Sequence, residues 1–238
     1  MSSESQTKPE FSGLPHKLLI GTHHKAGTEW MTAVFFQIKE HYDYDLDFNY
    51  HSQFDAKVLA QPFRGIYLIR DPRDVIISGC FYHQKSDEKW LHSPREKLGG
   101  LTYQQKINSF DSIEDQILFE MENAAALTIG DMIHWDYSHP NFFELKYEKL
   151  IEDTQLLLFH KAFSFLGFPG SVIPHILSIA YENSLFSGQV KSGHIRSEKN
   201  KQWEAYFTQN HKDRFTELFG DALIQLGYET DDSWPVKK

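Results

Sequence analysis

Apolar and polar residues along the chain follow two periods, that of a strand and that of a helix, and the clearest change between them lies near the N-terminus. Residues 18–20, Leu-Leu-Ile, form an apolar run that predicts a buried strand, and a tight loop over residues 23–27 follows it. Apolar residues then recur at helical spacing, at Trp30, Ala33, Val34 and Ile38. Gly27 or Thr28 would cap the helix that they predict. The pattern therefore indicates a strand–loop–helix unit over residues 18–39.

Three further segments have the pattern of strands. Apolar and polar residues alternate strictly over residues 44–51, which is typical of a strand with one buried face. Residues 65–69 are a short apolar run that ends at Arg70, and residues 141–147 predict another strand.

Helices are predicted between and after these strands. One begins at Asp71, which can cap it, with Pro72 suited to its first turn. One long helix is expected over residues 113–133, with Gly130 as its weak point, whereas residues 81–100 are expected to be irregular. Further helices are expected over residues 154–166, 171–181 and 212–226. The last of these should bury Phe215, Leu218, Phe219, Leu223 and Leu226.

Short apolar strands that alternate with helices indicate an α/β fold, a parallel sheet with helices on both faces. We expect one domain over residues 16–230, a flexible N-terminal tail over residues 1–15 and a C-terminal tail over residues 231–238. Ligands of such sheets bind beyond the carboxyl ends of the strands. Four polar candidates follow those ends, namely Lys25, His51, Arg70 and Tyr147.

Charge and composition exclude several classes of protein. The formal net charge of −9 argues against a general nucleic-acid binder, so an anionic ligand must be held by a local group of cations. The single cysteine, Cys80, excludes internal disulfides and suits a reducing compartment. No apolar run approaches the roughly 20 residues that span a bilayer. The polar start has no apolar core of a secretory signal, so we expect a cytoplasmic protein without membrane contact.

The loop over residues 23–27 has the chemistry of an anion site. A helix N-terminus presents backbone N–H groups and a positive dipole end, Gly27 allows close approach, and Lys25 adds a full charge. Lys25 stands two residues before the glycine, whereas the lysine of an ATP-binding Walker A loop follows it.

A second anion motif runs from Arg70 to Ser78. An arginine at a strand end and a hydroxyl eight residues later, two helical turns on, can hold one phosphate together. Two phosphate sites of this kind suit an adenosine with both 5′ and 3′ phosphates, and ATP has no 3′-phosphate for the second one.

Four segments together resemble the cytosolic and carbohydrate-type sulfotransferases. Residues 24–30, His-Lys-Ala-Gly-Thr-Glu-Trp, are similar to the family's P-K-S-G-T-T-W loop, and residues 70–78 to its R-N/D-P-K/R-D-x-x-x-S motif. Residues 146–150, Lys-Tyr-Glu-Lys-Leu, resemble K-Y-E-D-L, and the segment from Arg196 to Thr208 resembles R-K-G-x-x-G-x-W-x-x-x-F-T. In this last motif Glu198 and Lys201 stand where the family has glycines, which puts backbone contacts to phosphate there in doubt.

The resemblance implies a P-loop-like sulfotransferase fold and 3′-phosphoadenosine 5′-phosphosulfate (PAPS) as donor, with adenosine 3′,5′-bisphosphate (PAP) as product and no metal. The residues that it implies around the 5′-phosphosulfate are Lys25, Ala26, Gly27, Thr28, Glu29 and Trp30. Arg70, Ser78 and Arg196 would hold the 3′-phosphate, and Tyr147 the nucleotide. Trp30 and Phe186 could stack on adenine, and core packing is the alternative role of both rings.

In the mechanism that the resemblance implies, Lys25 neutralises the leaving oxygen and a base takes the acceptor's proton. His51 lies near the family's position for this base, and its ordinary pKa of about 6.5 suits the task. The surrounding sequence lacks the family's K-T-H-x-P, so Asp45, Asp47 or His24 could serve instead.

The sequence does not name the acceptor. We expect a small-molecule alcohol or amine, and Asp43, Asp45 and Asp47 could favour a cationic one, although a solvated strand face also explains these acids. A P-loop kinase or nucleotidase is an alternative function, and so is a catalytically silent nucleotide-binding protein. The oligomeric state cannot be predicted from the sequence.

Overall fold

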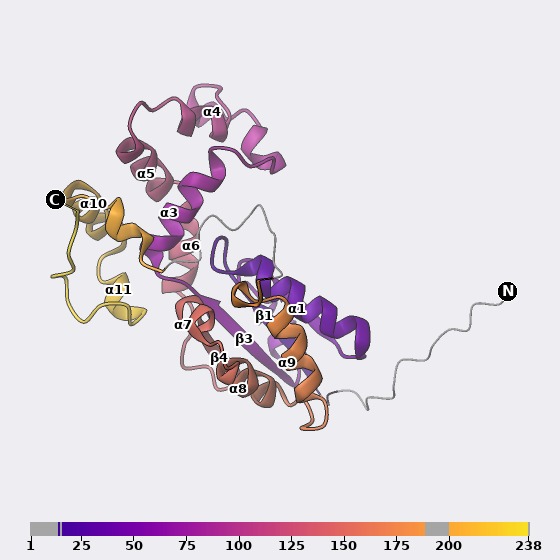
Figure 1. Cartoon of the computed structure of the whole chain (residues 1–238). Coiled ribbons are helices and arrows are strands. Elements are labelled where there is room, and N and C mark those ends of the chain that lie inside the picture. The colour runs from indigo at the N-terminus through magenta and orange to yellow at the C-terminus, as the bar shows by residue number, and fades with distance from the viewer. Residues whose placement is uncertain (1–13, 15, 189–199, 238) are drawn as a thin grey trace. The chain divides into compact units, whose positions relative to one another are not determined.

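The computed structural model of the chain describes Leu14 and residues 16–188 and 200–237 (Figure 1). The chain divides into two compact units. The first combines residues 1–69 with 136–192, and the second combines residues 70–135 with 193–238. Of the predicted site residues, Arg196 lies outside the described residues, as do Glu198 and most of the predicted N-terminal tail.

The first unit contains a four-stranded sheet in the order β2-β1-β3-β4. Its strands are β1 (Lys17–Gly21), β2 (Leu46–Asn49), β3 (Phe63–Ile69) and β4 (Phe142–Lys146). Every neighbouring pair is parallel, with Leu18 opposite Leu46 and Ile20 opposite Ile66. The structure thus confirms the predicted parallel sheet, although β2 is shorter than the alternation over residues 44–51 suggested.

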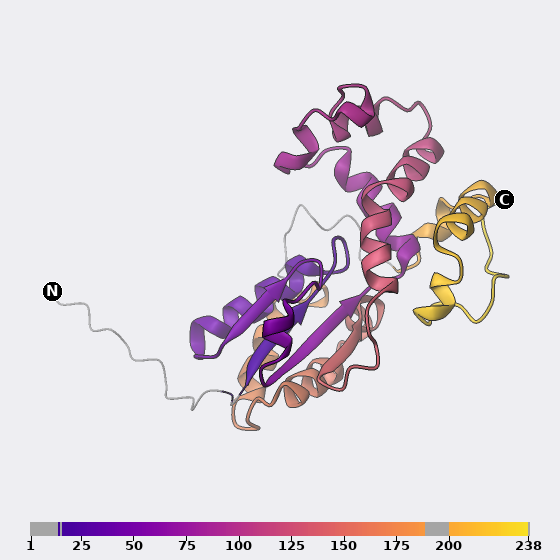
Figure 2. The ribbon, with the colours of Figure 1, turned by 180° about the vertical axis from the view of Figure 1, so that it is seen from behind.

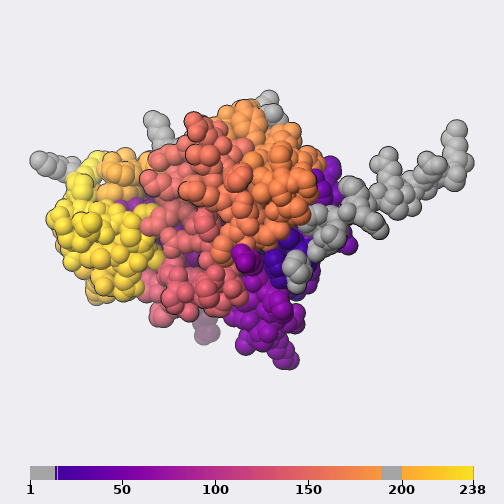
Figure 3. All heavy atoms as spheres, turned by 90° about the horizontal axis from the view of Figure 1, so that it is seen from below, coloured from indigo at the N-terminus to yellow at the C-terminus, as the bar shows by residue number. Residues whose placement is uncertain are grey.

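Three helices of this unit pack together over one face of the sheet. They are α1 (Thr28–His41), α8 (Leu157–Leu166) and α9 (Ile173–Glu182). One core cluster joins them to the strands, including Leu18, Ile20, Leu68, Val34, Phe163 and Ile176. The outer sides of α8 and α9, salmon to orange, form a continuous surface in the space-filling view (Figure 3). Ala33 is exposed, contrary to our expectation, because Met31 and Phe35 take the buried positions beside Trp30, Val34 and Ile38.

Connecting segments pack against the opposite face of the sheet (Figure 2). The ring of Phe54 lies 5.7 Å from that of Phe142, and the ring of Tyr67 lies 5.5 Å from that of Tyr137.

The first unit also contains short helices. One of them, α2 (Ala56–Leu59), lies in the connection after β2. Another, α7 (Tyr147–Glu152), follows β4 directly and was not predicted from the sequence pattern. A short 3-10 turn, η3 (Leu185–Ser187), follows α9.

The second unit is helical and is built around α3 (Pro72–His83), which packs against α4, α5 and α6. The elements that follow α3 are η1 (Lys89–His92), η2 (Glu96–Leu98), α4 (Tyr103–Asn108), α5 (Ile113–Glu122) and α6 (Ala124–Ile133). The C-terminal part adds η4 (Gln202–Ala205), α10 (Gln209–Phe219) and α11 (Ala222–Gln225).

Two predicted helices of this unit are in fact pairs of helices. Residues 113–133 divide at Asn123, where φ is −122° and ψ is −95°, while Gly130 lies within α6. Residues 212–226 divide at Gly220, whose φ of 57° and ψ of −125° are open to glycine and not to other residues. Leu218 is 37% exposed and Phe219 is half-buried, so the prediction that both are buried was wrong.

Candidate functional site

The loop between β1 and α1 is a hydrogen-bonded turn that leads into a helix N-terminus. The Ala26 N–H donates to the His23 carbonyl at 3.0 Å, and the Thr28 hydroxyl donates to the same carbonyl at 2.8 Å. Gly27 is the N-cap of α1, so the first-turn N–H groups of a 14-residue helix open onto the loop. Lys25 has a left-handed backbone with φ of 62°, a conformation that is uncommon for non-glycine residues.

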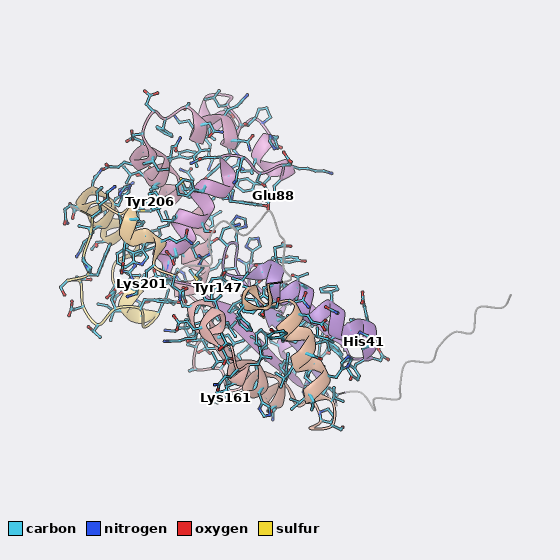
Figure 4. The ribbon with its side chains drawn as sticks, in the orientation of Figure 1. His41, Glu88, Tyr147, Lys161, Lys201 and Tyr206 are labelled. Carbon is cyan, nitrogen blue, oxygen red and sulfur yellow. The ribbon has the colours of Figure 1, made fainter. Side chains whose placement is uncertain are left out.

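Gly27 packs closely against side chains of the same unit. Its φ is 101°, and a Cβ on it would lie 2.8 Å from the Tyr147 ring and 3.1 Å from Leu68. Tyr147, labelled in Figure 4, begins α7 one residue after β4 and therefore lies beside the loop, as predicted. Trp30 is only 8% exposed, and its ring packs against those of Tyr147 and Phe159 at 6.4 and 5.5 Å.

The turn that carries His51 is hydrogen-bonded to this loop. The Thr22 N–H donates to the Asn49 carbonyl at 3.0 Å, and the Ser52 hydroxyl donates to the Thr22 carbonyl at 3.1 Å. The Asn49 side chain accepts the N–H groups of His51 and Gln53 at 2.9 and 3.1 Å, which holds the turn in shape. His51 itself is exposed. The first unit therefore brings Lys25, Thr28, His51 and Tyr147 to one end of its sheet.

His23 is a residue of this loop that the sequence did not single out. It is fully buried, and its Nε2 lies 2.5 Å from the Tyr67 hydroxyl. Burial lowers the pKa of His23 to about 3, and the charge of His51 adds to this effect. His23 is therefore neutral at any ordinary pH. The electrostatic effect of His51 on His23 agrees with a position of His51 near the loop, whereas no signal in the sequence predicted the burial of His23.

The alternative bases lie in less favourable places. Asp45 precedes β2 at the amino end of the parallel strands, where its carboxylate lies 3.6 Å from Lys17 Nζ. Asp47 is in the middle of β2, opposite Leu19. Among the candidates of the first unit, His51 and the loop residue His24 are the imidazoles at the carboxyl end of the strands.

The second unit holds the motif from Arg70 to Ser78 at the start of α3. Arg70 is buried to 6% exposure, and the Asp71 carboxylate caps the helix by accepting the Arg73 N–H at 2.9 Å. The Arg73 side chain also bonds Asp71 through two nitrogens, at 3.0 and 2.8 Å, and pairs with Glu229 at 2.6 Å. Its guanidinium lies 3.7 Å from the Trp203 ring centroid. Arg73 is thus a structural member of the motif.

Asp74 ties the motif to the C-terminal part of the same unit. Its two carboxylate oxygens accept the backbone N–H groups of Lys201 and Trp203 at 2.9 and 3.1 Å. Burial raises the pKa of Asp74, and the nearby positive charge of Arg70 opposes that rise. Ser78 is half-buried within α3, two turns beyond Asp71.

The remaining predicted residues have diverse settings. Ala26 is buried in the loop, and Glu29 is exposed in the first turn of α1. Phe186 is half-buried in η3, with its ring 5.9 Å from that of Tyr181.

The parallel sheet and its strand–loop–helix turn define an α/β protein of P-loop-like topology, in which α1 follows β1 and α3 follows β3 after short turns. Residues 48–227 match the sulfotransferase domain family, and the chain belongs to that family. It is therefore a PAPS-dependent sulfotransferase, with PAPS as its donor. The match begins within β2, so it does not include the loop around Lys25.

A solved structure supports the fold. The mouse sulfotransferase SULT7A1 complexed with PAP is similar with a TM-score of 0.53 and 17% sequence identity, over 87% of this chain and 84% of that chain. No curated protein sequence matches the chain. Within the described residues, no group of three or more His, Cys, Asp or Glu side chains is placed to hold a metal ion. None of the described helices has the length and apolar character needed to cross a bilayer.

Proposed function

We propose that the protein transfers the sulfuryl group of PAPS to a hydroxyl or amine of a small-molecule acceptor, with Lys25 stabilising the leaving group and His51 as general base. The observation that carries this proposal is the link between the His51 turn and the β1–α1 loop through Thr22. A base and a cation on two connected turns at one end of the sheet are the arrangement that in-line transfer between acceptor and leaving oxygen needs.

The donor residues agree with this assignment. In the first unit, the N-terminus of α1 favours an anion such as the 5′-phosphosulfate, and Gly27, with φ of 101°, brings the start of this helix close to the Tyr147 ring. Lys25, Ala26, Thr28 and Glu29 complete this loop, although the Ala26 N–H is already used by His23. In the second unit, Arg70 and Ser78 would bind the 3′-phosphate, together with Arg196. Tyr147 would hold the nucleotide, and the packing of Trp30 favours a core role for its ring, whereas Phe186 is half-buried and could stack on adenine.

The chemistry requires charge stabilisation at one point and proton removal at another. PAPS supplies an activated sulfuryl group whose S–O bond to the phosphate breaks as the bond to the acceptor forms. Lys25 would neutralise the charge that develops on the departing phosphate oxygen. His51 would take the proton that the acceptor hydroxyl or amine loses. Because burial and the coupling to His51 keep His23 neutral, His23 would not compete for that proton.

The proposal also includes a small-molecule acceptor and a cytoplasmic location. A small-molecule acceptor fits a chain of this size, and the buried single thiol of Cys80 is consistent with a cytoplasmic protein.

An acceptor screen with PAPS that measures PAP release tests the function, and three variants test the mechanism. Lys25→Ala should lower turnover by about 10²-fold or more while PAP still binds, since removal of one charge-stabilising donor has that effect. His51→Ala should abolish transfer without weakening PAP binding. His160→Ala, on the exposed side of α8, is the matched control and should leave the rate unchanged. A loss below about tenfold for Lys25→Ala, or full activity of His51→Ala, would contradict the assigned role.

A further inference from the structure

Lys201 has a backbone conformation that glycine would adopt more easily. Its φ is 56° and its ψ is 37°, in the left-handed region, where a Cβ costs free energy. Four non-glycine residues of the described chain have positive φ, and two of them are lysines, Lys25 in the β1–α1 loop and Lys201. A residue that keeps an unfavourable conformation needs either a structural or a functional reason.

The structural reason does not involve the Lys201 side chain. Asp74 holds the backbone here, because its carboxylate accepts the N–H groups of Lys201 and Trp203, and the buried Trp203 ring stacks on Arg73. These contacts would hold a glycine equally well. The Lys201 side chain is 69% exposed (labelled in Figure 4), and its Nζ lies 3.8 Å from the exposed Glu204 carboxylate. An exposed pair at that distance contributes little to stability.

The position of Lys201 supplies the functional reason. The Asp74 carboxylate that accepts the Lys201 N–H also interacts electrostatically with Arg70. The Lys201 side chain therefore starts from a backbone position next to the first turn of α3, beside the motif that contains Arg70 and Ser78. A lysine has a flexible stem and a compact charge, so it can move from Glu204 to an anion nearby.

We propose that Lys201 is an additional cation of the site formed by Arg70 and Ser78, and that it binds the 3′-phosphate of the donor. The inference rests on the proposed function of that site. It also explains why a lysine is kept at a glycine-like position, since the side chain binds ligand where a glycine could offer only its backbone.

The test compares binding of PAP and of AMP, which lacks the 3′-phosphate, to the full chain by calorimetry. Lys201→Gly should weaken PAP binding about three- to tenfold, the range of a solvent-exposed charge-assisted contact, and leave AMP binding unchanged. Its melting temperature should equal or exceed that of the wild type, because the strain is relieved. Lys201→Gln, which removes the charge and keeps a polar, slightly shorter side chain, should show the same loss of PAP affinity, and Lys201→Arg should restore it.

The control is Glu204→Gln, which removes the surface partner and keeps the lysine. It should bind PAP as tightly as the wild type or more tightly. High salt should reduce the difference between wild type and Lys201→Gln, because salt screens an exposed charge. If the wild type and Lys201→Gln bound PAP equally tightly, the proposed role of Lys201 would be wrong, and the assignment of Arg70 and Ser78 would still stand. If the wild type did not prefer PAP to AMP, the 3′-phosphate assignment of Arg70 and Ser78 would also be wrong.

Discussion

The hydroxyl of Ser52 donates a hydrogen bond to the carbonyl oxygen of Thr22 at 3.1 Å, across 30 residues of chain. Ser52 is 4% exposed and has a left-handed backbone with φ of 53°. Its neighbour in sequence is the proposed base, and Thr22 begins the loop that leads to Lys25. One side chain therefore helps to set the position of the base relative to the leaving-group cation.

Replacing Ser52 by alanine should impair catalysis more than donor binding. The variant loses one buried hydrogen bond, worth about 1 kcal/mol of unfolding free energy, and loosens the turn that carries His51. We expect a lower kcat with an unchanged Kd for PAP, measured by steady-state kinetics and calorimetry. Ser178→Ala, which removes a similar serine-to-carbonyl bond on the exposed side of α9, is the control. If both variants kept the wild-type kcat, the link would have no catalytic importance.

Gly27→Ala should weaken both the fold and the anion site. The new Cβ would stand 2.8 Å from the Tyr147 ring at φ of 101°, so either the loop or α7 must move, at a cost of about 1–3 kcal/mol. Urea unfolding should show this loss, and PAP binding should fall with it.

Gly130→Ala is the matched control for this substitution. Gly130 lies within α6, and a Cβ there would meet no atom within 4 Å, so alanine should stabilise the helix by about 0.5–1 kcal/mol. Equal effects of the two substitutions would show that the loop is not constrained at Gly27.

His23 should make the stability of the protein sensitive to acid. Below its ordinary pKa of 6.5 the unfolded imidazole takes up a proton, whereas the folded one, with a pKa of about 3, does not. The free energy of unfolding therefore falls as the pH drops from 6.5 towards 3, by up to about 1.4 kcal/mol per pH unit from this group.

Urea unfolding of wild type and His23→Gln at pH 7 and pH 5 measures this contribution. The wild type should lose about 2 kcal/mol more than the variant between these pH values. The other titrating groups are common to both proteins, so the difference isolates His23. An identical pH dependence would mean that the folded imidazole accepts a proton normally.

Arg73→Ala should strongly destabilise the second unit. Arg73 is 2% exposed, and its loss removes a bidentate side-chain partner of the buried Asp71 and the cation stacked on Trp203. Removing one member of a buried ion pair typically costs about 3–5 kcal/mol. Arg214→Ala, whose partners Glu122 and Glu217 are solvent-exposed, should change the urea midpoint little. A similar small change for Arg73→Ala would show that the cluster does not support α3.

Local signals in the sequence were sufficient for the main elements and for the motif positions. Alternation and apolar runs located all four strands of the described sheet, and the caps at Gly27 and Asp71 set the starts of α1 and α3. These signals were insufficient where a single residue ends a helix although the apolar spacing continues past it. Asn123 and Gly220 each divide a helix whose apolar spacing continues across the break.

The sequence by itself determined the fold class, the family and the order of the two anion motifs, because strand and helix periods and short phosphate-binding motifs depend on residues close together in the chain. Only the tertiary structure decided which side chains surround those motifs. The pairing of His23 with Tyr67, of Ser52 with Thr22 and of Asp74 with Lys201 joins residues 30 to 127 positions apart. Such contacts form only when the packed sheet and helices bring distant segments together, so no local pattern could predict them.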